Sequence, residues 1–184
     1  MRKPKYRENR IDILQSSFDY LTKSGLENIS MRDLCNGIGI SIGSVYYWFE
    51  NKEQLIVETA EYGLLKVSDD IFSHVLTALD DIHSSFEICM DKIEEHRDSL
   101  RYIYQLACSP VYSKLLRNMC SNLEPIYHEY AVKLSKELDM SVERALPLVY
   151  LFVSAVLDFA VWGNREQTSV QLDYIYKCFV EGRV

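Results

Sequence analysis

The chain has 184 residues, a net charge of −7 and 48% hydrophobic residues, enough to bury a core in one large domain or in a small domain attached to a larger one. Its five cysteines are odd in number, widely spaced and never form a C-x-x-C pair, so the sequence predicts neither a disulfide framework nor a zinc site. The N-terminal segment lacks the apolar core of a signal peptide, and no apolar run approaches the roughly 18 to 20 residues of a membrane helix, so we expect a cytoplasmic protein.

Charge is distributed unevenly along the chain. Residues 1–10 contain five basic side chains and one acid, whereas residues 56–184 contain 12 basic and 20 acidic groups. The overall negative charge argues against binding of a polyanion by the whole surface, but the basic N-terminal end can meet phosphate. Taken alone, that segment is better explained as a disordered, solvated tail.

Apolar residues recur at intervals of three and four, and Pro and Gly are scarce at 4 and 7 residues, so the sequence predicts an all-α chain. The first helix is expected over residues 9–24, with Gly25 as its C-terminal cap. Its apolar stripe is expected to consist of Ile11, Leu14, Phe18 and Leu21.

Two short helices are expected next. Ser30 opens one of them as an N-terminal cap, and Gly39 ends it. Ser41 is placed to cap a third helix that ends near Phe49. A helix-turn-helix motif needs a small residue where its two helices touch and a residue that tolerates positive φ at the turn. Cys35 and Gly39, four residues apart, meet these two requirements.

A long helix capped by Asn51 is expected over residues 52–80. Further helices are expected over residues 82–96, 98–108, 111–138 with a kink at Pro125, 141–163 and 168–181. The sequence therefore predicts a small domain over residues 1–50 and a larger helical domain over residues 51–184, joined by the long helix.

The third helix carries an unusual number of aromatic residues. A helical projection predicts that Val45 and Phe49 face inward. It predicts that Gly43, Ser44 and Tyr47 face outward. Tyr46 and Trp48 lie at its flanks. Phenol hydroxyls suit a contact with phosphate oxygens at a groove edge. Packing of these aromatics in the core is the alternative, but they exceed what one face of so short a helix can bury.

The segment ISMRDLCNGIGISIGSVYYWFENKEQL, residues 29–55, resembles the DNA-binding helix-turn-helix of TetR/AcrR-type transcriptional regulators. The matching positions are Gly39, Ser41, Gly43, Ser44, Tyr46, Phe49, Lys52, Glu53 and Leu55. The resemblance implies a three-helix DNA-binding domain joined to a larger helical domain for ligand binding and dimerisation. It covers about a quarter of the chain.

By position, the resemblance implies that Ile42 and Gly43 face the bases of double-stranded DNA. It also implies that phosphates are held by Ser30, Arg32, Ser44, Tyr46, Tyr47 and Lys52, with Ser41 and Trp48 in the same surface. The sequence departs from the family at two positions. Ile42 stands where a polar reader is common, and it either contacts a thymine methyl or turns inward; Trp48 replaces histidine or tyrosine.

The resemblance also implies a homodimer formed by the last two helices. Residues 148–162 contain a single charge, Asp158, which is more apolar surface than a half-exposed helix can hide in one small subunit. An isologous dimer would bury this surface and predict a palindromic operator. A monomeric core is the alternative. Asp158 either neutralises a cationic ligand or pairs with an Arg or Tyr at an interface.

Aromatic and sulfur-containing side chains on four of the predicted helices are candidates for an inducer pocket or, equally, for the core. They are Tyr62, Phe86, Met90, Tyr102, Tyr104, Met119 and Tyr127. Thirteen tyrosines and the negative charge favour a hydrophobic, aromatic or cationic inducer. No Walker loop, nucleophile elbow, H-E-x-x-H or pair of Glu-x-x-His motifs is present, so we expect no catalytic site, metal or cofactor.

We therefore interpret the chain as a dimeric regulator, more specifically a repressor that a small-molecule inducer releases from its operator. The inducer would favour a conformation in which the long fourth helix swings and separates the two recognition helices. A carrier or sensor of hydrophobic molecules without DNA binding is the alternative, but it leaves Lys52, the paired tyrosines and the basic end unexplained.

Overall fold

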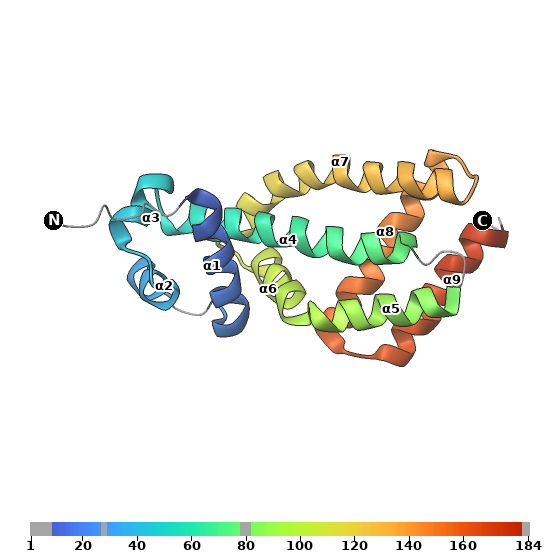
Figure 1. The fold of residues 1–184 in the computed structure, drawn as a ribbon, viewed down its shortest axis with the longest axis horizontal. Helices are drawn as coiled ribbons and strands as arrows, with labels where there is room; N and C mark the ends of the chain where they lie inside the picture. Colours follow the sequence, from blue (N-terminus) through green and yellow to red (C-terminus); the bar gives the residue numbers. More distant parts are fainter. Residues whose placement is uncertain (1–8, 27–28, 78–81, 182–184) are drawn as a thin grey trace.

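The computed structural model describes residues 9–26, 29–77 and 82–181. Within these ranges every regular element is an α-helix (Figure 1), which confirms the all-α prediction. The helices are α1 (Arg10–Ser24), α2 (Met31–Ile38), α3 (Ile42–Trp48), α4 (Lys52–Thr77), α5 (Ile82–Glu95), α6 (Arg97–Cys108), α7 (Ser113–Glu137), α8 (Val142–Trp162) and α9 (Arg165–Glu181).

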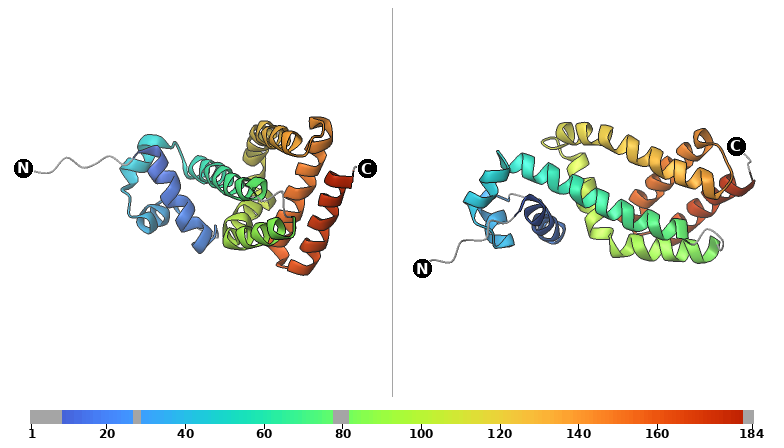
Figure 2. Two further views of the ribbon diagram at one scale, coloured as in Figure 1. Left: turned by 45° about the vertical axis from the view of Figure 1, so that its right-hand side comes forward. Right: turned by 45° about the horizontal axis from the view of Figure 1, so that its top comes forward.

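The helices form an elongated molecule with two parts. Helices α1, α2 and α3 lie together at one end, and α4 runs from them into a body made with α5 to α9 (Figures 1 and 2). Within the body α4 packs against α5, α6 and α7, while α8 packs between α7 and α9 and also contacts α6. Helix α4 is thus shared by both parts, as expected for the long connecting helix.

Local signals at the helix ends behave as the sequence predicts. Ser30 caps α2 by accepting a hydrogen bond from the amide of Asp33 at 3.1 Å, and the carboxylate of Asp33 accepts one from the amide of Ser30 at 3.1 Å. These reciprocal bonds satisfy amides that the helix itself leaves unpaired. The turn into α3 depends on Gly39, whose φ of 68° lies in the left-handed region that favours glycine.

Two details of the expected helices are wrong. Ile11 is exposed rather than part of the apolar stripe of α1, because Ile13 takes the buried position beside Leu14. Helix α9 begins at Arg165 rather than at residue 168, because Asn164 caps it by accepting the amide of Gln167 at 3.1 Å. The expected end of the fourth helix at residue 80 lies outside the described residues.

Helix α8 also departs from the expectation that no segment is long and apolar enough for a membrane. It has 21 residues and a mean hydropathy of 1.9 in its most apolar window, of which 44% is buried inside the body. Length and composition are weak grounds for a membrane span, because a core helix passes the same test. The buried part of α8 packs on α6, α7 and α9, and its exposed part carries the large apolar side chains of Tyr150, Leu151 and Trp162.

Helices α1, α4 and α6 meet at a close junction. Phe18 of α1 lies so near Gly63 of α4 that a β-carbon at Gly63 would be 1.9 Å from the Phe18 ring. Phe18 also makes an edge-on contact with Tyr102 of α6, with ring centroids 6.1 Å apart. The hydroxyl of Tyr102 donates a hydrogen bond of 3.4 Å to the carbonyl of Ile56 on α4. This α1–α4–α6 junction joins the N-terminal helices to the body.

Candidate nucleic-acid interface and apolar cavity

Helix α3 is anchored by two apolar side chains. Val45 and Phe49 are completely or almost completely buried, as the helical projection predicts. The helix is held at its start by Ser41, whose hydroxyl accepts the amide of Ser44 at 3.2 Å. Because the inward positions are filled by Val45 and Phe49, the other side chains of α3 are left on the surface.

The aromatic residues of α3 lie on that surface. Tyr46 is 52% exposed and Tyr47 is 54% exposed. Trp48 is 37% exposed and makes an edge-on contact with Tyr47 at a centroid distance of 4.9 Å. Ile42 is 43% exposed, so it faces outward rather than into the core. Beside it Gly43 has no atom within 4 Å of the position that a β-carbon would take, which leaves the backbone open to close approach.

Polar groups flank this surface. Arg32 on α2 is exposed, and Ser30 is exposed while its hydroxyl contacts the carboxylate of Asp33. That contact lowers the pKa of Asp33, so the carboxylate stays ionised. The hydroxyls of Ser41 and Ser44 lie 2.8 Å apart at the start of α3. Ser30 and Ser41 therefore already serve as helix caps, and any contact with phosphate would be an additional role.

Lys52 has a structural bond as well. Its ammonium group donates to the carbonyl of Ile29 at 3.1 Å, tying the first turn of α4 to the residue before the N-terminal cap of α2, and it lies 4.0 Å from the carboxylate of Glu53. Arg10 pairs with Glu58 of α4 and lies over the Phe49 ring at 5.4 Å from its centroid. The remaining basic residues of the N-terminal end lie outside the described residues.

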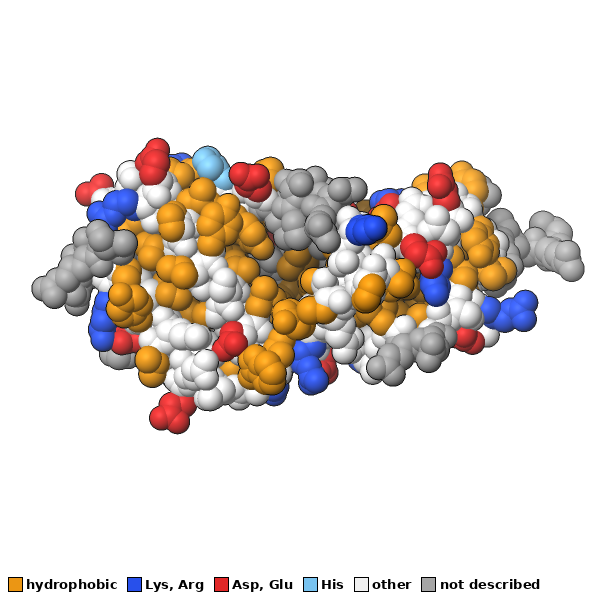
Figure 3. Space-filling view, turned by 180° about the vertical axis from the view of Figure 1, so that it is seen from behind, with side chains coloured by type: hydrophobic (Ala, Val, Ile, Leu, Met, Phe, Trp, Pro, Cys, Tyr) orange, Lys and Arg blue, Asp and Glu red, His pale blue; other side chains and the backbone are white. Residues whose placement is uncertain are grey.

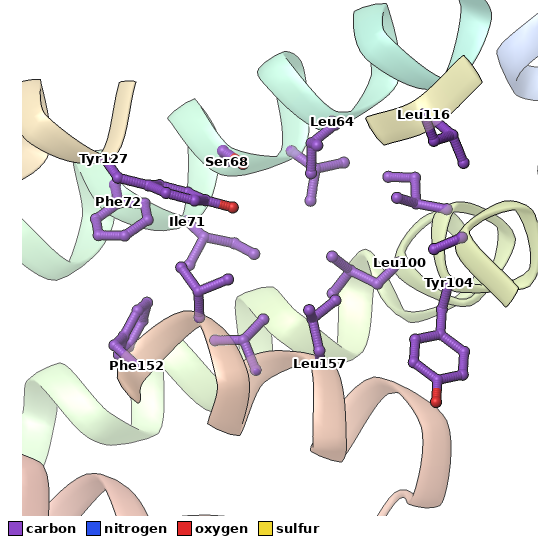
Figure 4. Close-up of a pocket in the computed structure, with 15 residues that line it drawn as sticks. Leu64, Ser68, Ile71, Phe72, Leu100, Tyr104, Leu116, Tyr127, Phe152 and Leu157 are labelled. Carbon is purple, nitrogen blue, oxygen red and sulfur yellow. The ribbon is translucent and has the colours of Figure 1, made fainter. Parts of the chain in front are cut away.

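The body contains an apolar cavity of about 190 Å³ between four helices (Figure 4). It is lined by Leu64, Val67, Ser68, Ile71 and Phe72 of α4, by Leu100, Ile103, Tyr104 and Ala107 of α6, by Leu116 and Tyr127 of α7, and by Phe152, Val153, Val156 and Leu157 of α8. None of these described residues is charged. Helices α4 and α6 each contribute to the cavity and to the α1–α4–α6 junction.

Among the described side chains that the sequence analysis selected for a ligand, two line this cavity, Tyr104 and Tyr127. Met90 and Tyr102 are buried in the core, where burial raises the pKa of the Tyr102 phenol, and the hydroxyl of Tyr62 binds Gln15 of α1. The side chains of Phe86 and Met119 lie outside the described residues.

Asp158 is also absent from the cavity lining. It is half-buried in a separate groove between α8 and α9, which is lined by Leu151, Tyr174 and Ile175 among others. The side-chain amide of Gln167 donates to its carboxylate at 3.4 Å. Asp158 is thus separated in the structure from Tyr104 and Tyr127, which line the cavity.

The aliphatic lining of the cavity was missed by sequence reasoning. Leu64, Val67, Ile71 and Phe72 recur at the spacing of one helix face, so their periodicity indicates burial. The same spacing is typical of an ordinary core, and nothing in it distinguishes a filled interior from a cavity.

The outer face of α8 and α9 exposes large apolar side chains. Trp162 is 75% exposed and Tyr174 is 68% exposed. Tyr150, Leu151 and Val170 are further exposed apolar residues on the described part of these two helices. Figure 3 shows the molecule from the side opposite to that of Figure 1, with apolar side chains gathered over the body. Such a surface is typical of an interaction site rather than of a monomer exterior.

Residues 13–59 match the tetR family of bacterial regulatory proteins. Curated relatives include HTH-type transcriptional regulators of Staphylococcus aureus strains USA300 and NCTC 8325, each 34% identical over 83 residues. The match covers 45% of this chain and 42% of each relative, so it spans less than half the length of these regulators.

Solved structures share the fold over nearly the whole chain. A transcriptional regulator from Rhodococcus sp. RHA1 is similar with a TM-score of 0.71 and 16% identity, covering 89% of this chain and 92% of that one. FadR from Thermus thermophilus, a TetR family transcriptional repressor in complex with lauroyl-CoA, has a TM-score of 0.60 and 13% identity, covering 96% and 95%. At such identities the likeness concerns the fold alone.

Proposed function

We propose that this chain, whose residues 13–59 are similar to the tetR family of bacterial regulatory proteins, is a cytoplasmic, dimeric transcriptional repressor of that family. It would release a palindromic operator when a small molecule binds its body. The observation that carries the proposal is the exposed surface of α3, where Ile42, Tyr46 and Tyr47 project outward while Val45 and Phe49 hold the helix on its domain. We place the boundary between the two domains near residue 50.

We assign the exposed surface of α3 to the major groove of DNA. Ile42 and Gly43 at its start would face the bases, with the apolar Ile42 suited to a thymine methyl group. Tyr46 and Tyr47 would donate hydrogen bonds to phosphates on either side, together with Ser44 and the exposed Arg32 of α2. Contacts with phosphates fix the position of the protein on DNA without reading its sequence, so specificity would also depend on DNA shape.

A second copy of the chain supplies the second recognition helix. The exposed apolar side chains of α8 and α9 would be buried in an isologous four-helix contact, and the groove that holds Asp158 would then be covered by the partner. Asp158, already bonded to Gln167, would lie at this interface. Two α3 helices related by a two-fold axis read half-sites about one DNA turn apart.

The ligand response would use the helices that line the cavity. Helix α4 lines the cavity with Leu64 and Val67 and contacts Phe18 of α1 at Gly63. Helix α6 lines the cavity with Ile103 and contacts the Phe18 ring through Tyr102. A ligand that favours a different spacing of α4 and α6 therefore shifts α1 and the helices packed on it. The separation of the two α3 helices would then no longer fit the operator.

Selection of bound duplexes from a randomised DNA pool, followed by affinity measurements at several salt concentrations, tests the proposal. A palindromic sequence should be enriched. Arg32→Ala should weaken binding to all sequences alike and reduce the slope of log affinity against log salt by about one. The matched control is Arg144→Ala, which removes an exposed arginine on α8 and should leave both quantities unchanged. Lack of any enrichment would instead favour a carrier that uses only the cavity.

A further inference from the structure

The lining of the cavity restricts the charge of its ligand. Among the described lining residues the only polar side chains are the hydroxyl-bearing Ser68, Tyr104 and Tyr127. A charged ligand would lose its hydration there without gaining an opposite charge, which strongly disfavours binding. A neutral, apolar molecule loses little on entry and gains contact with the aliphatic walls.

Three acidic residues adjoin the cavity lining in sequence, and none of them is a lining residue. Asp69, next to Ser68 on α4, is exposed. Asp70 on α4, between the lining residues Ser68 and Ile71, accepts a hydrogen bond from His96 at 2.7 Å and lies 3.6 Å from the ammonium of Lys92. Asp158 on α8, next to the lining residue Leu157, opens into the groove beside α9. None of these carboxylates lines the cavity, so the lining offers no negative charge to neutralise the cationic inducer that the sequence analysis kept open.

Size sets a second limit. The cavity of about 190 Å³ is somewhat larger than an engineered cavity of about 150 Å³ that holds benzene. A matching ligand therefore has on the order of ten non-hydrogen atoms, that is, one ring or a short chain with a few further atoms.

The hydroxyl groups set the third limit. Figure 4 shows the Tyr127 ring extending from α7 toward α4, with its hydroxyl on the side of α4 that carries Ser68, whereas the hydroxyl of Tyr104 points away from the other lining side chains. Tyr104 is also half-exposed and shares a hydrogen bond with Cys108, which raises the pKa of its phenol. The polar part of the cavity is thus the region of Ser68 and Tyr127.

We propose that the cavity binds an uncharged, mainly apolar molecule of about ten non-hydrogen atoms with one hydrogen-bonding group, which Ser68 and Tyr127 receive. The inference deepens the ligand response under the proposed function and rests on it for its regulatory meaning. Binding itself can be measured without DNA, so the two claims can fail separately.

Four compounds of nearly equal size test the inference by titration calorimetry on the purified full chain. Phenylpropanol is neutral and polar at one end, butylbenzene is neutral and apolar, phenylpropylamine is cationic and phenylpropanoate is anionic at neutral pH. We expect phenylpropanol to bind at least about tenfold more tightly than either charged compound. Equal or tighter binding of a charged compound, or no binding of any of the four at millimolar concentration, overturns the inference.

Two variants locate the site. Val156→Phe fills the cavity and should abolish binding, whereas Val111→Phe, the same change at an exposed position outside the lining, should not; thermal unfolding of both variants verifies folding. Ser68→Ala should weaken the binding of phenylpropanol by about two- to tenfold, because one neutral hydrogen bond is lost, and should leave the binding of butylbenzene unchanged. Unchanged phenylpropanol binding in both Val156→Phe and Ser68→Ala places the ligand elsewhere and refutes the site.

Operator binding then separates the inference from the proposed function. If phenylpropanol binds as expected but leaves operator affinity unchanged at saturation, the ligand class stands and the ligand-responsive repressor is contradicted. If a charged compound binds more tightly and releases the operator, the proposed function stands and the ligand class is refuted.

Discussion

Replacement of Gly63 by alanine tests the α1–α4–α6 junction most directly. The added methyl group would lie 1.9 Å from Cε2, 2.3 Å from Cδ2 and 2.4 Å from Cζ of Phe18. Phe18 is only 5% exposed and also makes an edge-on contact with the ring of Tyr102, so the ring has little room to move away from α4. The substitution therefore places one methyl group into a space that is already filled.

The expected cost follows from two opposing effects. Overpacking of a buried contact destabilises by about 1–3 kcal/mol, and the better helix propensity of alanine offsets up to about 1 kcal/mol of this loss. We expect Gly63→Ala to lower the free energy of unfolding by about 1–2 kcal/mol, which for a chain of this size corresponds to a fall in melting temperature of about 3–6 °C.

Urea and thermal unfolding followed by circular dichroism measure this change. Phe18→Leu removes the clashing ring atoms, so the double variant should be more stable than the sum of the two single effects by about 1 kcal/mol or more. Gly43→Ala is the matched control: its β-carbon meets no atom within 4 Å, so it should be neutral or stabilising by up to about 1 kcal/mol. Wild-type stability of Gly63→Ala, or strict additivity with Phe18→Leu, would refute the packing argument.

Three further variants test other parts of the molecule. The hydrogen bond from His96 lowers the pKa of Asp70. Ionised Asp70 therefore stabilises the fold above its unfolded pKa of about 3.9, and this contribution is lost as the pH falls through the lower folded pKa. In urea unfolding, the free energy of unfolding should fall less between about pH 6 and about pH 3 for Asp70→Asn than for wild type. Leu151→Glu places a charge on the exposed apolar face of α8 and should convert dimer to monomer in sedimentation velocity at micromolar concentration, whereas a dimer of wild-type affinity would move the interface elsewhere. Tyr47→Phe keeps the ring and removes the hydroxyl, so operator affinity should fall by about two- to tenfold for all sequences alike, and a changed sequence preference would contradict the assignment to phosphate.

The sequence alone determined the features that depend on neighbours along the chain. Ser30 and Ser41 cap the predicted helices, and Gly39 adopts its left-handed turn, because caps and turns involve residues within four positions of each other. The inward positions Val45 and Phe49 and the exposed tyrosines of α3 follow from helical geometry in the same way. The resemblance over residues 29–55 then leads to the family that the comparisons support.

Tertiary structure decided what faces each apolar stripe. Tyr102 and Tyr104 are two residues apart on α6, yet one packs in the junction and the other lines the cavity. Asp158 lies on the same helix as the lining residue Leu157 but opens onto the groove beside α9. Periodicity indicates that a helix face is covered, but the covering side chains come from helices distant in the chain. Whether they leave a cavity, fill a core or leave a surface for a partner depends on packing between helices, which local sequence does not encode.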